Sequence, residues 1–210
     1  MKILELFSGT QSISKVFEQK GWEIFTVDNN PYFEEITTWK VDILTITAQD
    51  ILDKFGKPDV IWASPPCTTF SVASIGKHWN KDNTPKTKDA EIGLLILEKT
   101  IEIIKALKPK YFFIENPMGK MRKMPIMEQF NKYTVTYCQY GDKRMKPTDI
   151  WTNHPNPKFK PMCKKGMPCH EAAPRGSQTG TQGLENAIEK ARIPNELCKY
   201  INKLCSEEME

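Results

Sequence analysis

Long apolar runs are absent from this 210-residue sequence, since no stretch approaches the roughly 18 residues of a membrane-spanning helix. We therefore expect no membrane association. The opening, MKILELFSGT, lacks a basic segment followed by a small-residue cleavage site, which indicates a first strand and not a signal peptide. Internal repeats and long linkers are also missing. With 39% hydrophobic and 27% charged residues, the composition predicts one globular domain over residues 1–210.

The six cysteines lack the spacing of a disulfide framework, so we expect a reducing, cytoplasmic setting. A short C-x-x-C metal knuckle is also missing around Cys67, which has no other cysteine within four residues on either side. Cys67 is therefore either a small buried apolar residue at a strand end or a nucleophile on a rigid turn.

A zinc site is one interpretation of CKKGMPCH, where Cys163, Cys169 and His170 are close in sequence. His154 or Cys138 could then supply a fourth ligand. The cysteine spacing is wider than that of ordinary structural zinc sites, so we favour loop residues that bind no metal.

Acidic residues are scarce in the later middle of the chain. Residues 105–175 contain 15 Lys or Arg and 5 Asp or Glu, although the net charge of the whole chain is only +4. Such segregation is typical of a surface that faces nucleic acid, and a solvated basic surface without a partner is the alternative.

Apolar runs alternate with amphipathic segments along the chain. KILELF, WEIFTV, PDVIWAS and YFFIEN predict strands, and residues 10–20 and 87–107 have apolar residues at helical spacing. This alternation predicts an α/β fold with a mostly parallel sheet and helices on both faces. KYTVTYCQYG predicts a later strand, residues 153–183 a loop, and RIPNELCKYINKLC a closing helix with Cys198 and Cys205 in the core.

Four polar clusters follow predicted strands: FSGTQS, DNN, SPPCTTFS and ENP. Ligands of an open parallel sheet bind at the carboxyl ends of its strands, so these clusters should meet in space. Their convergence favours the nucleophile interpretation of Cys67.

Two of the clusters are typical of nucleotide binding. Gly9 lets a ligand approach the backbone, although many strand–helix turns contain glycine. Asp28 ends the second strand, where it could bind ribose hydroxyls or serve only as a cap. Together they indicate a cofactor that carries adenosine.

The other two clusters carry reactive side chains. Two prolines constrain the backbone before Cys67, and a thiolate there could attack an electron-poor carbon. Glu115, at the end of FFIENP, could donate a proton to a ring nitrogen or merely cap the next turn. Each feature is ambiguous alone, but the combination in this order is specific.

With these motifs in place, the sequence resembles the cytosine-C5 DNA methyltransferases, which use S-adenosylmethionine. LELFSGTQS is similar to the family's cofactor-binding opening, SPPCTTFS to its nucleophile loop and FFIENP to its Glu-Asn motif. QYGDKRMKPTDIWTN resembles the basic motif, and RIPNEL the closing Asn motif. The resemblance covers most of the chain and implies a Rossmann-like, S-adenosylmethionine-dependent methyltransferase fold.

The chain departs from the family pattern at several positions. Gln11 stands where a second glycine is usual, Asp28 where Glu is usual, and Pro117 where Val is usual. Where the family's basic motif has a Gln-x-Arg-x-Arg pattern, this chain offers only the charges of Arg144 and Lys146. The interval that usually holds the target-recognition region is about 30 residues here, so we expect residues 153–183 to be a reduced recognition loop.

The resemblance implies a reaction in which Cys67 adds to carbon 6 of cytosine and Glu115 protonates or hydrogen-bonds ring nitrogen 3. Carbon 5 then takes the methyl group, and the base must be flipped out or single-stranded. The implied catalytic residues are Cys67, Glu115, Arg144 and Lys146. The implied cofactor-binding residues are Phe7, Ser8, Gly9, Thr10, Asp28, Asn29, Asp42, Ile43, Pro65 and Asn195.

Cytosine-containing DNA is the expected substrate, and tRNA is a rival that keeps the same chemistry. A nucleic-acid-binding protein with a vestigial cofactor pocket is a rival of another class. A nicotinamide-dependent reductase is disfavoured, since the opening lacks the full G-x-G-x-x-G pattern. The target sequence and oligomeric state stay open, and a partner subunit could supply target recognition. His78 and Trp79 could fill the gap left by a flipped base, or lie in an exposed loop.

Overall fold

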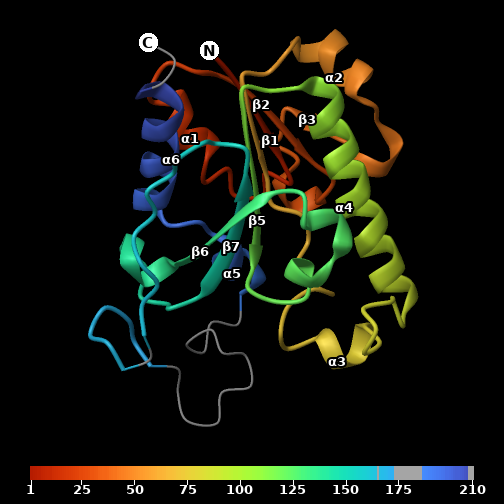
Figure 1. The fold of residues 1–210 in the computed structure, drawn as a ribbon. Coiled ribbons are helices and arrows are strands. Elements are labelled where there is room, and N and C mark those ends of the chain that lie inside the picture. The colour runs from red at the N-terminus through yellow and green to blue at the C-terminus, as the bar shows by residue number, and fades with distance from the viewer. Residues whose placement is uncertain (165, 173–185, 208–210) are drawn as a thin grey trace.

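The computed structural model describes residues 1–164, 166–172 and 186–207 (Figure 1). Its centre is a seven-stranded sheet with the order β3-β2-β1-β4-β5-β7-β6. The strands are β1 (Lys2–Leu6), β2 (Glu23–Asp28), β3 (Trp39–Lys40), β4 (Val60–Ala63), β5 (Tyr111–Pro117), β6 (Asn131–Thr136) and β7 (Pro147–Thr152). Strands β1 to β5 pair in parallel, whereas β7 runs antiparallel to both β5 and β6. The prediction of a mostly parallel α/β sheet is therefore confirmed.

Helices cover both faces of the sheet (Figure 1). On one face lie α1 (Ser14–Glu18) and α6 (Asn195–Glu207), and on the other α2 (Ala48–Phe55) and α4 (Lys88–Leu107). Shorter helices are α3 (Ile75–His78) and α5 (Ala187–Ala191), with 3-10 turns η1 (Pro31–Phe33), η2 (Ile43–Thr45), η3 (Met121–Lys123), η4 (Pro125–Met127) and η5 (Tyr137–Tyr140). No helix among the described residues is long and apolar enough to span a bilayer.

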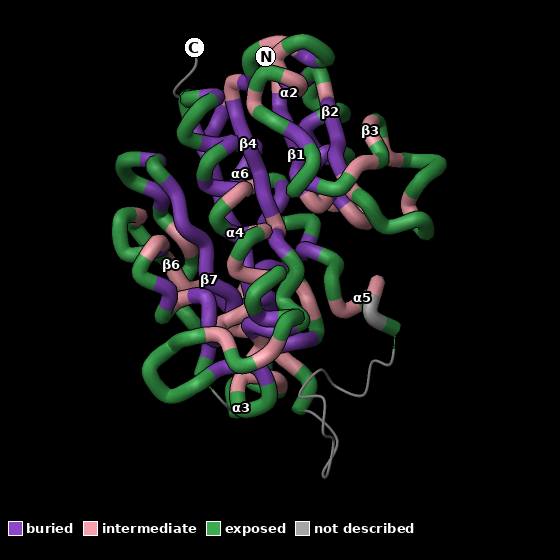
Figure 2. Tube along the Cα trace, turned by 90° about the vertical axis from the view of Figure 1, so that its right-hand side faces the viewer, coloured by how far each residue is buried: buried purple, intermediate pink, exposed green. Residues whose placement is uncertain are grey.

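The sheet separates two apolar cores, and this arrangement explains the continuous apolar strands. Leu4 and Ile61 pack with the core under α2 and α4, whereas their neighbours Ile3 and Trp62 pack with the core under α1 and α6. Because alternate side chains of a strand point to opposite faces, a strand between two cores needs an apolar residue at each position. Figure 2 shows β1 and β4 buried along most of their length. The closing helix buries Cys198 and Cys205, as predicted.

Several elements differ from the sequence prediction. Helix α2 lies between two predicted strands, where no helix was expected, and its start is a capping box in which Thr47 and Asp50 each accept the other's backbone N–H. Strand β7 was missed because it lies inside the segment assigned to the basic motif. The predicted helix over 10–20 is regular only over Ser14–Glu18, and the strand in KYTVTYCQYG ends at Thr136, where η5 begins.

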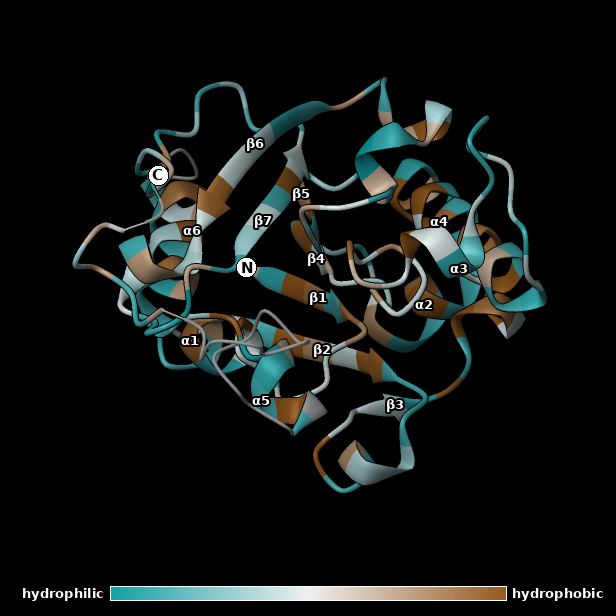
Figure 3. Cartoon of the chain, turned by 90° about the horizontal axis from the view of Figure 1, so that it is seen from below, coloured by the Kyte–Doolittle hydropathy of each residue, from teal (hydrophilic) through white to brown (hydrophobic). Residues whose placement is uncertain are grey.

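The carboxyl ends of the parallel strands meet at one edge of the sheet, away from both termini (Figure 1). Figure 3 looks onto this end of the strands from below, with α3 and α5 on opposite sides of it. All four polar clusters of the sequence follow strands that end here, as predicted.

Candidate active site

Cys67 lies on a turn between β4 and α3. Its carbonyl oxygen accepts hydrogen bonds from the backbone N–H groups of Phe70 and Ser71, at 3.1 and 2.9 Å. Thr69 and Phe70 are buried and anchor the turn, because Trp79 donates its indole N–H to the Thr69 carbonyl at 2.8 Å. Cys67 itself is exposed. The turn therefore presents the thiol on a fixed base, and the interpretation of Cys67 as a buried apolar residue is wrong.

Two glycines let neighbouring segments approach this turn closely. A Cβ on Gly119, just after β5, would lie 2.2 Å from the Phe70 carbonyl oxygen. A Cβ on Gly93, in α4, would lie 2.7 Å from Thr69 Oγ1. The backbone N–H of Lys120 donates to the same Phe70 carbonyl at 2.7 Å. Sequence analysis missed both glycines, although a glycine inside a predicted helix is a signal of close packing.

Glu115 and Asn116 end β5 beside the turn. The Glu115 side chain is buried, and its Oε1 accepts a hydrogen bond from the Tyr137 hydroxyl at 3.0 Å. Asn116 is fully buried and donates its amide N–H to the Pro65 carbonyl at 2.8 Å. The two residues of the Glu-Asn pair thus make different contacts. Tyr137 holds the Glu115 carboxylate, and the Asn116 amide holds the nucleophile loop.

The charged groups around Cys67 shift the pKa of its thiol in opposite directions. Although Cys67 has solvent-exposed surface, the protein around its sulfur partly removes the thiol from water, and this raises the pKa of Cys67. The Glu115 carboxylate raises that pKa further, and the Lys146 ammonium lowers it. Burial lowers the pKa of Lys146, while Glu115 and Cys67 both favour its charged form. Lys146 Nζ also lies 4.5 Å from the centre of the Tyr137 ring. Cys67, Glu115 and Lys146 therefore form one electrostatically coupled group.

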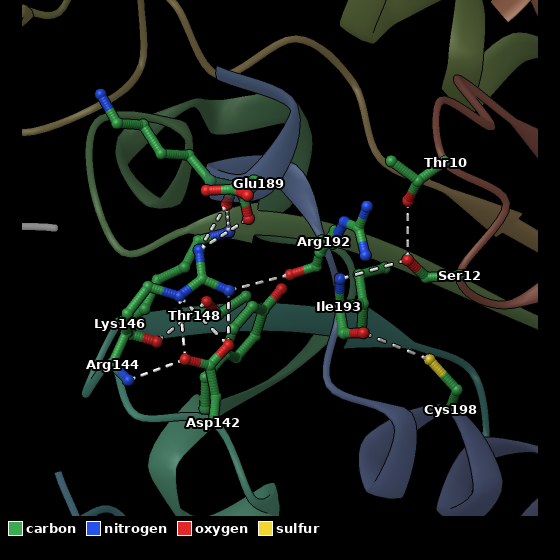
Figure 4. A network of polar contacts seen from close by, with 12 residues as sticks. Thr10, Ser12, Asp142, Arg144, Lys146, Thr148, Glu189, Arg192, Ile193 and Cys198 are labelled. Atoms are coloured by element: carbon green, nitrogen blue, oxygen red, sulfur yellow. Dashed lines mark hydrogen bonds and ion pairs between the residues drawn. The ribbon is translucent and has the colours of Figure 1, made fainter. Parts of the chain in front are cut away.

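Arg144 has a different environment, which Figure 4 shows. Its guanidinium forms an ion pair with Asp142 and donates to the carbonyl oxygens of Glu189, Lys190 and Arg192 at 3.0, 3.0 and 3.3 Å. These bonds fix the segment that precedes α6. The catalytic role predicted for Arg144 stays a prediction, and its contacts are those of a structural clamp.

The clamp continues towards the opening loop (Figure 4). The backbone N–H of Ile193 donates to Ser12 Oγ at 3.3 Å, and Ser12 Oγ lies 2.9 Å from Thr10 Oγ1. The basic, closing and opening motifs, which are far apart in sequence, are therefore one polar network in space.

A small hollow lies beside this group, at the carboxyl ends of β1 and β2. Five of the predicted cofactor residues line it, together with Pro66, which sequence analysis did not select. The lining residues are Phe7, Val27, Asp28, Asn29, Val41, Asp42, Ile43, Pro66 and Ile96. The hollow combines apolar walls with two carboxylates, as a nucleoside needs for its base and its ribose.

Other predicted cofactor residues lie around this hollow or outside it. Gly9 donates its backbone N–H to Asp28 Oδ2 at 2.8 Å, while Ser8 and Pro65 are buried. Thr10 and Asn195 line a separate hollow beside α1. The structure therefore does not bring Thr10 and Asn195 to the hollow of Asp28.

The opening loop has a strained backbone. Phe7, Gly9 and Gln11 all have positive φ, at 59°, 45° and 57°. A left-handed conformation is costly for residues other than glycine, which accounts for the glycine that the resemblance expects at position 11. The Gln11 side chain donates to the Ile36 carbonyl and to Thr26 Oγ1, and these bonds offset part of that cost.

The expectations for His78 and Trp79 are wrong. Both are buried, His78 Nδ1 lies 2.7 Å from Thr87 Oγ1, and the Trp79 ring packs on Phe70. Neither side chain lies in an exposed loop or is free to enter a duplex, and both support the nucleophile turn.

Comparison with known proteins gives a consistent result. The profile described as "C-5 cytosine-specific DNA methylase" matches residues 1–137. A "Probable DNA (cytosine-5)-methyltransferase" of Frog virus 3 (isolate Goorha) is 35% identical over 161 residues, or 73% of this chain and 71% of that protein. The "Type II methyltransferase M.FnuDI" of Fusobacterium nucleatum is 30% identical over 131 residues, or 59% of this chain and 34% of that enzyme. The chain thus spans about a third of this bacterial relative.

A solved structure supports the fold. A protein encoded within an E. coli prophage and described as a DNA modification methyltransferase aligns with a TM-score of 0.54 and 16% identity, over 72% of this chain and 46% of that chain. At this identity the likeness shows the fold alone, which is the Rossmann-like methyltransferase fold. Since the family profile covers more than half of the chain and the viral relative matches most of its own length, the chain belongs to the C-5 cytosine-specific DNA methylase family.

Proposed function

We propose that this chain transfers a methyl group from S-adenosylmethionine to carbon 5 of cytosine in DNA. The observation that carries the proposal is geometric: Cys67 lies on a fixed turn, which Asn116 ties to the end of β5 beside the buried Glu115, and Tyr137 holds the Glu115 carboxylate. The charges of Glu115 and Lys146 both act on the Cys67 thiol. A nucleophile, an acid and a cation there match the needs of a reaction that must add to an aromatic ring and then restore it.

Cys67 is the covalent nucleophile of the proposed reaction. The thiol gives up its proton, its sulfur bonds to carbon 6 of the ring, and the electrons of the double bond move to carbon 5. Glu115 delivers a proton or a hydrogen bond to ring nitrogen 3, which stabilises the electron-rich ring. Loss of the carbon 5 proton after methylation and cleavage of the S–C6 bond restore the ring and free Cys67.

The neighbours of these two residues position them. Tyr137 holds Oε1 of Glu115, so the other carboxylate oxygen can face the ring nitrogen. Asn116 fixes the backbone of the nucleophile loop at Pro65. Lys146 favours the thiolate form of Cys67, and it has a strained backbone with φ of 27°.

S-adenosylmethionine, when bound, supplies an electrophilic methyl group. The hollow of Phe7, Asp28, Asp42 and Ile43 fits this cofactor, because its carboxylates can accept hydrogen bonds from hydroxyls and its walls are apolar. Each Asp28 oxygen already accepts one backbone N–H, from Gly9 or Asn30, and a carboxylate oxygen has capacity for more. The buried Ser8 hydroxyl has no hydrogen-bond partner among the described residues and is a further candidate for cofactor contact.

DNA binding rests on fewer basic residues than the sequence suggests. Arg122 pairs with the buried Asp149, and Arg144 pairs with Asp142, so neither guanidinium is available to phosphates. Lys158 and Lys164 are exposed within residues 153–183, the predicted recognition loop. Lys160 is exposed as well, but its ammonium donates to the Gln139 carbonyl at 2.8 Å and pairs with Glu196. Lys165 and Arg175, the other two basic residues of this interval, lie outside the described residues.

The test is transfer of tritiated methyl from S-adenosylmethionine to duplex DNA, single-stranded DNA and total tRNA. We expect transfer to cytosine carbon 5 in DNA, and transfer to tRNA alone would replace the substrate but keep the chemistry. Cys67→Ala should abolish transfer, and Glu115→Gln should lower it by roughly 10²-fold, the scale of general acid catalysis. Cys205→Ala, which changes a cysteine of the α6 core, is the matched control.

A trapping experiment tests the covalent step separately. DNA with 5-fluorocytosine should form an adduct with the wild type and with Cys205→Ala, because fluorine cannot leave as the carbon 5 proton does. Cys67→Ala should form none. Methyl transfer by Cys67→Ala at the wild-type rate would contradict the proposal, and no transfer to any of the three substrates would favour a nucleic-acid-binding protein with a vestigial pocket.

A further inference from the structure

Three thiols and an imidazole meet at η5, and none of them belongs to the group of Cys67, Glu115 and Lys146. Cys138 lies in η5, and Cys163, Cys169 and His170 come from the segment after β7. Their ligand atoms, the three Sγ atoms and a ring nitrogen, all lie within 4.8 Å of one another. The sequence left His154 and Cys138 as alternative fourth ligands, and the structure brings Cys138 to the group.

Four of the six distances between ligand atoms are close to the edges of a zinc tetrahedron, and the other two are within 4.8 Å. Zinc–sulfur bonds of about 2.3 Å and zinc–nitrogen bonds of about 2.0 Å place two sulfurs about 3.8 Å apart and a sulfur and a nitrogen about 3.5 Å apart. Cys169 Sγ lies 3.3 Å from Cys163 Sγ and 3.6 Å from Cys138 Sγ. His170 Nδ1 lies 3.3 Å from Cys163 Sγ and 3.8 Å from Cys169 Sγ.

The surroundings of the sulfurs suit thiolates. Gln139 directs its amide N–H at Cys169 Sγ from 3.5 Å, a contact that stabilises a metal-bound thiolate. The backbone N–H of Cys163 donates to Thr136 Oγ1 at 2.9 Å and fixes that ligand against the end of β6. A set of three soft sulfur ligands and one imidazole selects zinc over the hard cations magnesium and calcium.

Phe159 packs against Tyr133 and Tyr200, but the part of the segment that carries the three ligands has little apolar packing to hold it. Met162 and Met167 are 43% and 49% exposed, so neither contributes a buried core. A salt bridge between the exposed side chains of Lys143 and Glu171 adds little stability. Small or loop-rich segments of this kind gain their folding energy from a structural metal or a covalent link.

We propose that Cys138, Cys163, Cys169 and His170 bind one structural Zn²⁺ ion, which holds residues 158–164 and 166–171 against η5. Cys138 directly follows Tyr137, whose hydroxyl holds Glu115. The ion would therefore fix the ligand-bearing segment next to a residue that positions Glu115. The site is independent of the methyl-transfer proposal, because no ligand belongs to the coupled group of Cys67.

The first test is metal content of the full chain, purified with a reductant and without chelators. We expect close to one zinc per chain by mass spectrometry of the elements, and loss of most of it in Cys163→Ser and in Cys169→Ser. Cys205→Ser, a change in the α6 core, should keep the zinc. Hydrogen exchange should show residues 158–171 opening in the two ligand variants and not in the control.

The second test does not depend on variants that fold. Replacement of the zinc by Co²⁺ in the wild type should give sulfur-to-cobalt charge-transfer absorption and the intense visible bands of a tetrahedral ion. Reduced protein that takes up neither metal would overturn the proposal, as would full zinc retention by Cys163→Ser or Cys169→Ser. A disulfide among these cysteines, found by alkylation and peptide mass spectrometry of protein purified with the reductant, would also overturn it.

Discussion

The side-chain amide of Asn116 donates a hydrogen bond of 2.8 Å to the carbonyl oxygen of Pro65. This bond joins the end of β5 to the nucleophile loop, two residues before Cys67. Glu115 and Cys67 therefore keep their relative position, because Asn116 is next to Glu115 and Pro65 belongs to the loop of Cys67. The relationship assigns Asn116 a positioning role that motif comparison alone does not provide.

Asn116→Ala should lower the rate of methyl transfer by about 10- to 100-fold, because small misplacements of a reacting group have effects of that size. We expect kcat to fall while affinity for S-adenosylmethionine, measured by calorimetry, is unchanged. Asn153→Ala is the matched control, since Asn153 bonds to the backbone of β5 at its other end, through Phe112 and Lys110. Equal losses of kcat in the two variants would contradict a specific role for Asn116.

The sequence predicted the edge where the site forms, because apolar strands and the polar clusters after them are local patterns. Phe7, Asp28, Asp42 and Ile43 lie together as expected. The environment of Arg144 could not be predicted, since its partners at residues 189–192 are more than forty residues away and offer backbone carbonyls. Backbone acceptors leave no sequence signal.

The same limit applies to the nucleophile turn and to the cysteine cluster. Gly119 is required by contact with the Phe70 backbone, which no spacing rule reveals. Cys138 joins Cys163 only because β7 runs back along β6, and that strand was missed. The described part of the chain does not extend over residues 173–183, so the single-domain organisation and the reduced recognition loop stay predictions.

The reactivity of Cys67 should depend on pH in a way that two variants shift in opposite directions. Burial and the Glu115 carboxylate raise the pKa of the thiol, and Lys146 lowers it. Because the thiolate is the reactive form, alkylation by iodoacetamide should increase with pH towards a midpoint above that of an ordinary thiol. Glu115→Gln should move the midpoint to lower pH and Lys146→Met to higher pH.

Alkylation is followed at Cys67 alone by peptide mass spectrometry, since the chain has five other cysteines. Lys164→Met, which removes an exposed charge of the recognition loop, is the control and should leave the midpoint in place. Shifts of Glu115→Gln and Lys146→Met in the same direction would show that their charges do not act on the sulfur.

Gly119→Ala should impair catalysis more than Gly93→Ala. A Cβ at 119 would lie 2.2 Å from the Phe70 carbonyl oxygen, so the backbone of the nucleophile turn must move. At 93 the obstacle is the Thr69 hydroxyl at 2.7 Å, which a rotation of that side chain can relieve. Alanine also favours the α4 helix by about 1 kcal/mol over glycine. We expect at least a tenfold loss of kcat for Gly119→Ala and a few-fold loss for Gly93→Ala.

Both glycine variants are compared by steady-state kinetics and by thermal unfolding. Melting temperatures that fall in step with kcat would mean that the losses reflect global stability, against the prediction of a local displacement.

Glu5 should make the protein less stable as pH rises. Glu5 is a buried residue of β1, and Ser14 donates its backbone N–H to Glu5 Oε2 at 2.9 Å. Burial raises the pKa of Glu5 from 4.5 to about 7. Between these values the folded state binds more protons than the unfolded state, so the free energy of unfolding falls as pH rises through this window. Above about pH 7 Glu5 is ionised in both states, and the full cost of burying its charge lowers the free energy of unfolding.

Glu5→Gln removes the charge and keeps an acceptor for Ser14. By urea unfolding, we expect it to be more stable than the wild type at pH 8 by on the order of 2–3 kcal/mol, with a much smaller difference at pH 5. Glu23→Gln, at the exposed start of β2, should show no such pH dependence. A constant difference at both pH values would refute the buried charge as the cause.

DNA binding should be governed by charge and have a loose sequence context. Phosphate contacts give affinity without sequence information, and base contacts need several well-positioned side chains, which a short loop region offers sparingly. Replacing Lys158 and Lys164 by Ala should lower the slope of log affinity against log salt by about 0.9 for each lysine that binds a phosphate. Lys57 and Lys105, exposed at the opposite edge of the sheet, are the matched controls and should leave the slope unchanged.

Binding should weaken equally across sequences, and a methylome should show a context of about two to four base pairs. A single strict site of six or more base pairs would instead require a partner subunit, or extensive base contacts from the recognition loop itself, to read the DNA.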